Sequence, residues 1–211
     1  MISEVYNIDN MEYMRTLPDK FFDVCITDFP YGVNAEYNSF DDTPENVIDL
    51  ISKAMPEILR TSKRAVITSG VKLLFHYPKP DWVGCIYSSA GVGVGSHGFC
   101  CWQPLLIYGS DPKLKLQLGS HPDSFIYNGG NDAESKFHPV PKPIKFWRKV
   151  FDRWTNENDK IIFDPFLGSG TSRVAAYDMG FDFVGCELDK DYFDAGNKRF
   201  ELFKSQGKLF K

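Results

Sequence analysis

The chain has 211 residues, of which 43% are hydrophobic and 25% charged, a mixture typical of a globular protein rather than a disordered one. No apolar run approaches the roughly 18 residues that a membrane-spanning helix needs, and the N-terminus lacks the pattern of a signal peptide, so we expect a cytoplasmic protein. The formal net charge of −4 does not exclude nucleic acid, because residues 1–60 carry −8 and the remainder +4.

The first third of the chain predicts alternating helices and strands. A short helix is expected over 10–17, with Asp9 or Asn10 at its N-cap and Pro18 after its end. The apolar run 22–27 predicts a buried parallel strand. Helical spacing of apolar residues follows over 44–60, where Pro56 should cause a kink, and a second buried strand is expected over 64–68.

The middle of the chain, about 70–136, is rich in glycine and offers only short strand candidates such as 104–108. We interpret it as a loop-rich insertion around one or two strands at a sheet edge. Regular elements then return, with helices expected over 143–154, 170–179 and 190–203 and strands over 160–163 and 182–186. Alternation of this kind predicts an α/β fold with a mostly parallel sheet covered on both faces.

Five cysteines are present, an odd number, and no Cys-x-x-Cys pair or Cys/His spacing suggests zinc. We interpret them as reduced, small hydrophobic residues, and we expect no metal site.

A glycine-rich turn follows the strand expected over 160–163. The residues Asp164-Pro165-Phe166-Leu167-Gly168-Ser169-Gly170-Thr171 read as strand end, tight turn and helix start. No lysine follows the last glycine, as a phosphate-binding loop would require, and position 173 is Arg where a dinucleotide fingerprint has Gly or Ala. The loop therefore disfavours a pyrophosphate ligand, although a turn without any ligand is the simpler alternative.

Glu187 ends the next strand, nineteen residues after Gly168. An acid at that position can accept hydrogen bonds from both ribose hydroxyls. Since ligands of parallel sheets bind at the carboxyl ends of strands, the two segments together favour a nucleoside that carries no diphosphate.

Asp28-Phe29-Pro30-Tyr31 follows the first strong strand and should lie at the same sheet edge. The carboxylate of Asp28 and the carbonyl of Phe29 can each accept one N–H of an exocyclic base amine, which directs the nitrogen lone pair at an electrophile. A base inside a duplex must be flipped out to reach such a site, and Tyr31 could stack on it. Taken alone, the tetrapeptide could also be a simple turn.

These motifs, in this order, resemble the β-class amino-methyltransferases of restriction–modification and phage systems. Asp28–Tyr31 resembles their Asp-Pro-Pro-Tyr, residues 138–143 their His-Pro-x-x-Lys-Pro, and residues 164–171 their cofactor loop. The resemblance implies a Rossmann-like class I methyltransferase fold with circularly permuted motif order, in a single domain over 1–211. It also implies the cofactor S-adenosyl-L-methionine, bound by Asp9, Asn10, His138, Lys142, Asp164, Phe166, Gly168, Ser169, Gly170, Thr171 and Glu187.

The resemblance further implies duplex DNA as partner, with the target base flipped out, and it leaves a homodimer or a partner subunit open. Two departures stand out. Phe29 replaces the usual first proline, and the region that should read the target, 70–136, is short. The basic run Lys136 to Arg153, with six bases against Asp152, could contact phosphate or form a solvated helix face.

Asp rather than Ser at position 28 favours adenine N6 as the target within this family. Three alternatives stay open: a cytosine N4 or RNA methyltransferase of the same fold, a catalytically inactive nucleic-acid-binding relative, and a methyltransferase acting on small-molecule or protein amines. The last alternative fits less well, because such enzymes have the cofactor loop before the Asp-Pro-Pro-Tyr motif.

Overall fold

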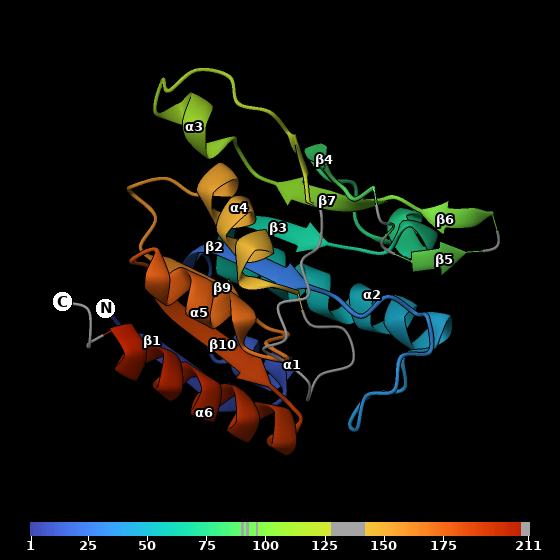
Figure 1. Ribbon diagram of the computed structural model, residues 1–211, viewed down its shortest axis with the longest axis horizontal. Helices are drawn as coiled ribbons and strands as arrows, with labels where there is room; N and C mark the ends of the chain where they lie inside the picture. Colours follow the sequence, from blue (N-terminus) through green and yellow to red (C-terminus); the bar gives the residue numbers. More distant parts are fainter. Residues whose placement is uncertain (90, 92, 96, 128–141, 208–211) are drawn as a thin grey trace.

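The computed structural model describes residues 1–89, 91, 93–95, 97–127 and 142–207 (Figure 1). Within these residues one sheet of eight strands runs in the order β1-β10-β9-β2-β3-β7-β4-β8. In chain order its strands are β1 (Ser3–Asn7), β2 (Phe22–Asp28), β3 (Ser62–Thr68), β4 (Trp82–Tyr87), β7 (Trp102–Tyr108), β8 (Ser124–Ile126), β9 (Ile161–Asp164) and β10 (Asp182–Glu187). Neighbouring strands are parallel except that β7 is antiparallel to both β3 and β4.

Helices cover both faces of the sheet, which confirms the predicted α/β class. One face packs against α1 (Asn10–Arg15), α2 (Pro44–Thr61) and the 3₁₀ helix η1 (Val71–His76), through side chains such as Val47 and Ile51. The other packs against α4 (Ile144–Trp154) and α5 (Thr171–Asp178), through Phe146 and Phe151. The helix α6 (Lys190–Gly207) contacts α5, β1 and β10.

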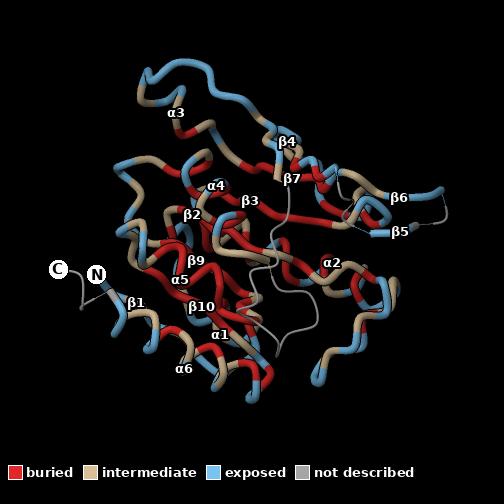
Figure 2. Tube along the Cα trace, viewed as in Figure 1, coloured by how far each residue is buried: buried red, intermediate tan, exposed pale blue. Residues whose placement is uncertain are grey.

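The central strands are buried along most of their length, as the red segments of Figure 2 show. Strands β2 and β9 are nearly continuous apolar runs, and strands covered on both faces require this composition. These strands were therefore predicted correctly from the sequence. A strand that is buried on both faces needs a continuous apolar run, which can be recognised without knowing the strands that pair with it.

The 70–136 region contains more regular structure than its glycine content suggested. Strand β7 lies between β3 and β4, and its residues 103–108 are buried, so it is an interior strand of the sheet. A two-stranded ribbon of β5 (Gly93–Gly95) and β6 (Gly98–Cys100) connects β4 to β7, and a short helix α3 (Pro112–Lys115) follows. Short strands of this kind form through pairing with distant partners, which their own composition does not reveal.

Predicted helix ends agree with the observed ones to within four residues. Pro143 is the N-cap of α4 rather than its first residue, and Pro56 lies inside α2, which continues to Thr61. Gly170 precedes α5 as its N-cap, with a left-handed φ of 71° that favours glycine.

Candidate active site

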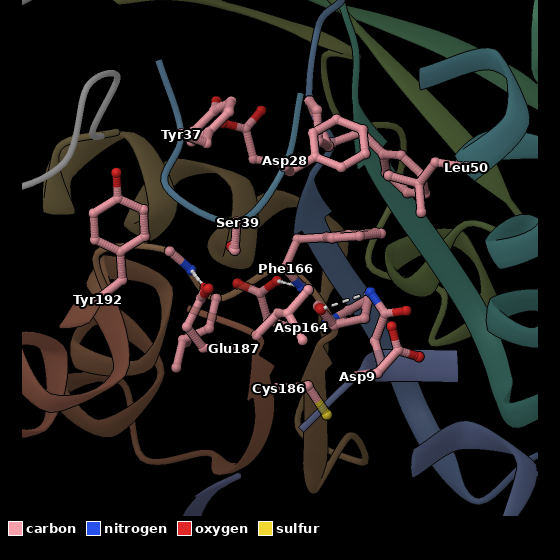
Figure 3. Close-up of a pocket in the computed structure, with 18 of the residues that line it drawn as sticks. Asp9, Asp28, Tyr37, Ser39, Leu50, Asp164, Phe166, Cys186, Glu187 and Tyr192 are labelled. Carbon is pink, nitrogen blue, oxygen red and sulfur yellow. Dashed lines mark hydrogen bonds between the residues drawn. The ribbon is translucent and has the colours of Figure 1, made fainter. Parts of the chain in front are cut away.

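A cavity of about 430 Å³ opens at the carboxyl ends of β2, β9 and β10, beside the start of α1 (Figure 3). Twelve residues predicted for the site lie on its wall: Asp9, Asn10, Asp28, Phe29, Pro30, Lys142, Asp164, Phe166, Gly168, Ser169, Thr171 and Glu187. Gly170 and Tyr31 adjoin the wall through their chain neighbours, and His138 lies outside the described residues. The fold therefore brings segments more than 150 residues apart in the chain to one cavity.

Asp164 is a buried carboxyl group at the end of β9, only 1% exposed. Its Oδ1 accepts hydrogen bonds from Thr27 Oγ1 (2.5 Å) and from the backbone N–H of Phe166 (3.1 Å), and its Oδ2 accepts one from Ser172 Oγ (2.5 Å). Burial raises the pKa of Asp164 to about 6, although these donors oppose the rise. Asp164 thus fixes the loop after β9 to β2 on one side and to α5 on the other.

Glu187, at the end of β10, holds the glycine turn in place. Its Oε2 accepts the backbone N–H of Gly168 (2.7 Å) and its Oε1 accepts that of Asp189 (2.8 Å). Burial raises the pKa of Glu187, and the two backbone donors act against this. The carboxylate therefore faces the cavity from the strand next to the turn, where the sequence placed it.

The backbone conformation of the turn, rather than a lack of space, requires glycine at position 170. An added Cβ would stand 3.6 Å from Gly196 Cα, in ordinary contact, but the φ of Gly170 is +71° and strains any other residue. The hydroxyl groups of Ser169 and Thr171 lie 2.9 Å apart, and Arg199 Nη1 donates to Thr171 Oγ1 (2.8 Å).

Asp9 and Asn10 line the cavity from the start of α1. Asp9 is the N-cap of that helix, accepting the backbone N–H groups of Met11 (2.8 Å) and Glu12 (3.1 Å). Asn10 is buried and its Nδ2 donates to the carbonyl of Pro165 (3.1 Å), which connects α1 to the loop after β9. Both side chains therefore have structural roles as well as places on the wall.

Asp28 stands at the end of β2 within a dense set of donors. Its Oδ1 accepts hydrogen bonds from the hydroxyls of Tyr31 and Thr68, and its Oδ2 lies 2.9 Å from Lys142 Nζ. The ion pair is only partly exposed, at 13% for the Lys142 side chain and 19% for that of Asp28. Burial and the neighbouring Asp28 carboxylate raise the pKa of Tyr31 well above its ordinary value, so its hydroxyl keeps its proton.

The Tyr31 hydroxyl makes two further contacts. Gln103 Nε2, from β7, donates to it, and so does Lys142 Nζ (2.8 Å). The Lys142 ammonium also lies 4.8 Å from the centre of the Tyr31 ring. Lys142, predicted beside the cofactor, thus reaches the cavity wall but forms its polar contacts with Asp28 and Tyr31.

Phe29, the departure from the usual proline, is a core residue with 2% exposure. Its ring lies 4.4 Å from that of Phe166 and 5.5 Å from that of Tyr77. Since Phe166 belongs to the loop after β9, the Phe29 side chain packs the two motifs against each other. Packing of this kind restricts the backbone that a proline would otherwise have stiffened.

Sequence reasoning missed the loop between β2 and α2. Asp42 is buried there and accepts backbone N–H groups from Gly32 (2.8 Å), Val33 (3.0 Å) and Ala35 (3.1 Å). This clamp positions the segment whose Tyr37, Ser39 and Phe40 line the cavity, and Figure 3 shows Tyr37 beside Asp28. An acid ten residues after a turn gives no local signal for such a role.

The sequence also missed one face of α2, which brings Asn46, Asp49, Leu50 and Lys53 to the cavity, and Tyr192 at the start of α6. The spacing of the α2 residues matches one helical face, but nothing in the sequence indicates what that face contacts. Tyr192 follows Glu187 by five residues, so its proximity to the site could have been inferred.

The expected basic run is partly neutralised. Arg148 pairs with Asp178 (2.7 Å) and Arg153 with Asp111 (2.6 Å), while Lys136 is outside the described residues. Across the described part of the chain, no group of three His, Cys, Asp or Glu side chains could hold a metal ion. No helix among those residues is long and apolar enough to cross a membrane.

Known proteins share this sequence pattern. A family model described as DNA methylase matches residues 120–198. The putative methylase YubD of Escherichia coli (strain K12) is 37% identical over 213 aligned residues, which span 90% of this chain and 87% of that protein. The type II methyltransferase M2.LlaDCHI of Lactococcus lactis subsp. cremoris is 40% identical over 70 residues, and this match covers 33% of this chain and 26% of that protein.

Solved structures share the fold. The complex of M1.HpyAVI with SAM superposes with a TM-score of 0.65 at 22% identity, covering 94% of this chain and 98% of that one. The PvuII DNA methyltransferase, described as cytosine-N4-specific, gives a TM-score of 0.72 at 12% identity, covering 97% and 91% of the two chains. Likeness at these identities shows a common architecture.

Proposed function

The chain belongs to the S-adenosylmethionine-dependent DNA methyltransferases of the N6/N4 type, and we propose that it methylates the exocyclic N6 amine of adenine in duplex DNA. The observation that carries this proposal is the single cavity that joins Asp28, from the first motif, to the Gly168 turn and Glu187, from the second. Transfer of a methyl group to a base amine requires that the amine and the methyl donor be held next to each other. One cavity wall offers both a hydrogen-bond acceptor for the amine and a binding site for the nucleoside part of the cofactor.

The cavity suits the cofactor in shape and charge. Its volume of about 430 Å³ lies in the range of small-molecule sites. Each oxygen of Glu187 accepts one backbone N–H and has a second lone pair for a ribose hydroxyl. Five carboxylates and two lysines line the wall, an excess of negative charge that favours a cationic ligand: Asp9, Asp28, Asp49, Asp164, Glu187, Lys53 and Lys142. When bound, S-adenosylmethionine supplies a methyl group on a positively charged sulfur.

The chain's own contribution to the reaction is to orient and stabilise the target amine. Asp28 accepts one N–H of the amine through Oδ2, and the carbonyl of Phe29 accepts the other. These two acceptors stabilise the positive charge that develops on nitrogen, and Asp28 Oδ2 then takes the proton that the nitrogen releases. Tyr31 stacks on the flipped base, and Tyr37, on the wall beside Asp28, is a second ring available for stacking.

We further propose that residues 1–211 form one methyltransferase domain whose 70–136 region contacts the DNA target. Strand β4 ends and β7 begins at the sheet edge that carries Asp28, so the β5–β6 ribbon lies at that edge. The paired side chains of Val94 and Phe99 on the ribbon are 78% and 79% exposed. Residues 82–110 contain no Asp, Glu, Lys or Arg, so the ribbon carries no negative charge that would repel a polyanion.

Expression in a methylation-deficient bacterial host, followed by digestion of its DNA and mass spectrometry of the nucleosides, tests the proposal. We expect N6-methyladenine with the wild-type chain. The level should fall at least about 100-fold with Asp28→Asn, which removes the charge but keeps the shape. Asp152→Asn, on the exposed face of α4, is the matched control and should change nothing.

The favoured alternative is cytosine N4, since a structure described as cytosine-N4-specific shares this architecture. N4-methylcytosine in the same digest would retain the amine chemistry and correct the base. A digest without any methylated base would refute the proposed reaction. If the purified protein nevertheless binds S-adenosylmethionine, this result would favour a non-catalytic binding protein.

A further inference from the structure

The hydroxyl of Tyr31 has one hydrogen to donate and two lone pairs to accept with. Gln103 Nε2 and Lys142 Nζ both donate to its oxygen, the lysine at 2.8 Å. These two donors occupy both lone pairs, and the single hydrogen is directed to Asp28 Oδ1. An ionised carboxylate can only accept, so Tyr31 is the donor in this pair. Because Gln103 and Lys142 meet the hydroxyl as donors, they offer its hydrogen no competing acceptor, and the hydrogen stays on Asp28 Oδ1.

The same count can be made at Asp28, whose carboxylate accepts about four hydrogen bonds. The hydroxyls of Tyr31 and Thr68 occupy Oδ1, and Lys142 Nζ takes one position on Oδ2 at 2.9 Å. Among the described residues this leaves one acceptor position on the carboxylate, at Oδ2. Asp28 lines the cavity, so that position is where an amine N–H can bind.

We propose that Gln103 and Lys142 are positioning residues for methyl transfer: because both meet the Tyr31 hydroxyl as donors, they keep its hydrogen on Asp28 Oδ1, and Oδ2 retains one acceptor position for the target amine. The inference rests on the proposed function and adds to it the residues that set the geometry of the acceptor. Neither residue needs to touch the reacting atoms, because each acts through Tyr31 and Asp28.

The location of Gln103 supports a positioning role. It is 7% exposed, at the start of the antiparallel strand β7, and it is not on the cavity wall. Leu105, two residues further along the same strand, pairs with Thr68, the second hydroxyl donor to Asp28. A buried amide held by a strand of the sheet has few alternative orientations, so it fixes its partner more firmly than a loop residue could.

Gln103→Glu is the sharpest test, because it keeps size and shape while replacing a donor with an acceptor-only carboxylate. The Tyr31 hydroxyl then donates to the new carboxylate at position 103, and Asp28 Oδ1 loses the hydrogen bond from Tyr31. We expect kcat to fall about 10- to 100-fold, as misplacement of a catalytic group does, with S-adenosylmethionine affinity changed less than about threefold. Gln206→Glu, an exposed isosteric change on α6, is the control.

The assay measures transfer of labelled methyl groups to genomic DNA from a methylation-deficient host, together with calorimetric titration of S-adenosylmethionine. Lys142→Met should also lower kcat, and Lys142→Arg should recover part of the loss because it restores a charged donor. Lys63→Met, which removes the lysine partner of Asp23 at the opposite end of β2, controls for the loss of one ion pair. Unchanged kcat in Gln103→Glu would overturn the inference.

A double-mutant cycle keeps the test independent of activity. Urea unfolding of Gln103→Glu, Tyr31→Phe and the double variant should show strong non-additivity, because the phenylalanine removes the hydroxyl on which position 103 acts. Additive effects would overturn the inference even if the wild-type chain fails to methylate DNA. Failure of the wild-type chain on DNA, with the non-additivity present, would instead refute the proposed function alone.

Discussion

Asp164→Asn should change the way in which stability depends on pH. The carboxyl group is 1% exposed and burial raises its pKa from an ordinary value of 3.8 to about 6. Between these values the folded protein holds a proton that the unfolded chain has released. The group therefore contributes stability that is fully present below about pH 3.8 and is lost as pH rises through 6.

The size of the effect follows from the shift. A change of about two pH units corresponds to about 3 kcal/mol of unfolding free energy over the whole range, at about 1.4 kcal/mol per unit. Roughly half of this, about 1 kcal/mol, is lost between pH 5 and pH 7.5. An asparagine does not titrate, so the wild-type chain should lose about that much stability relative to the variant over this interval.

The asparagine can keep the local contacts. Its Oδ1 accepts from Thr27 and from the backbone N–H of Phe166, as the carboxylate oxygen does, and its amide can donate to the hydroxyl of Ser172 after that hydroxyl rotates. The variant should therefore fold, and the comparison isolates the titration.

Urea unfolding of both proteins at pH 5, 6 and 7.5 measures the difference. Other titrating groups are common to the two proteins and cancel in it, provided that the m-values agree. Asp152→Asn, at an exposed position on α4, controls for the loss of one negative charge. A stability difference that stays constant across the three pH values would refute the assignment of a raised pKa to Asp164.

Three further predictions concern the loops around the cavity. Glu187→Gln places its NH2 group against the backbone N–H of either Gly168 or Asp189 and removes the negative charge, so calorimetry should show S-adenosylmethionine binding at least about tenfold weaker, and unaltered affinity would contradict the role of the carboxylate. Asp42→Ala removes the acceptor of three backbone N–H groups and should lower the unfolding free energy by about 2–3 kcal/mol in urea; a loss below about 0.5 kcal/mol would count against the clamp. Gly32→Ala should cost at least about 1–2 kcal/mol, because its φ is +66° and the new Cβ would lie 2.9 Å from Leu73 Cδ1; an unchanged thermal midpoint would contradict this.

The residues that sequence reasoning found share one property, which is that their signal is local. Asp28 ends an apolar run, and Asp164 and Gly168 belong to one continuous segment. A buried strand followed by polar or glycine residues can be recognised without knowing any partner, and the carboxyl ends of parallel strands meet at one edge. The α/β class, the motif order and twelve residues of the cavity wall could be predicted for this reason.

What could not be predicted depends on pairing between distant segments. Gln103 reaches Tyr31 only because β7 enters the sheet in reverse, between β3 and β4, with a register that sets Leu105 opposite Thr68. Cofactor contact stays a prediction for Lys142, and nothing in the sequence indicated that its ammonium lies on Asp28, 114 residues away in the chain. Neither contact has a periodicity or a motif in the sequence that would reveal it.

The reversed strand has one more consequence. Because β7 runs against its neighbours, the segment that joins β4 to β7 must lie at the same edge as the cavity, whatever its length. Insertions between Tyr87 and Trp102 would enlarge the surface beside the cavity, while the strands beneath keep their partners. If this region contacts the DNA target as proposed, exchange of that one hairpin between homologues should alter the DNA sequence that is selected, while the groups at the carboxyl ends of the other strands stay in place.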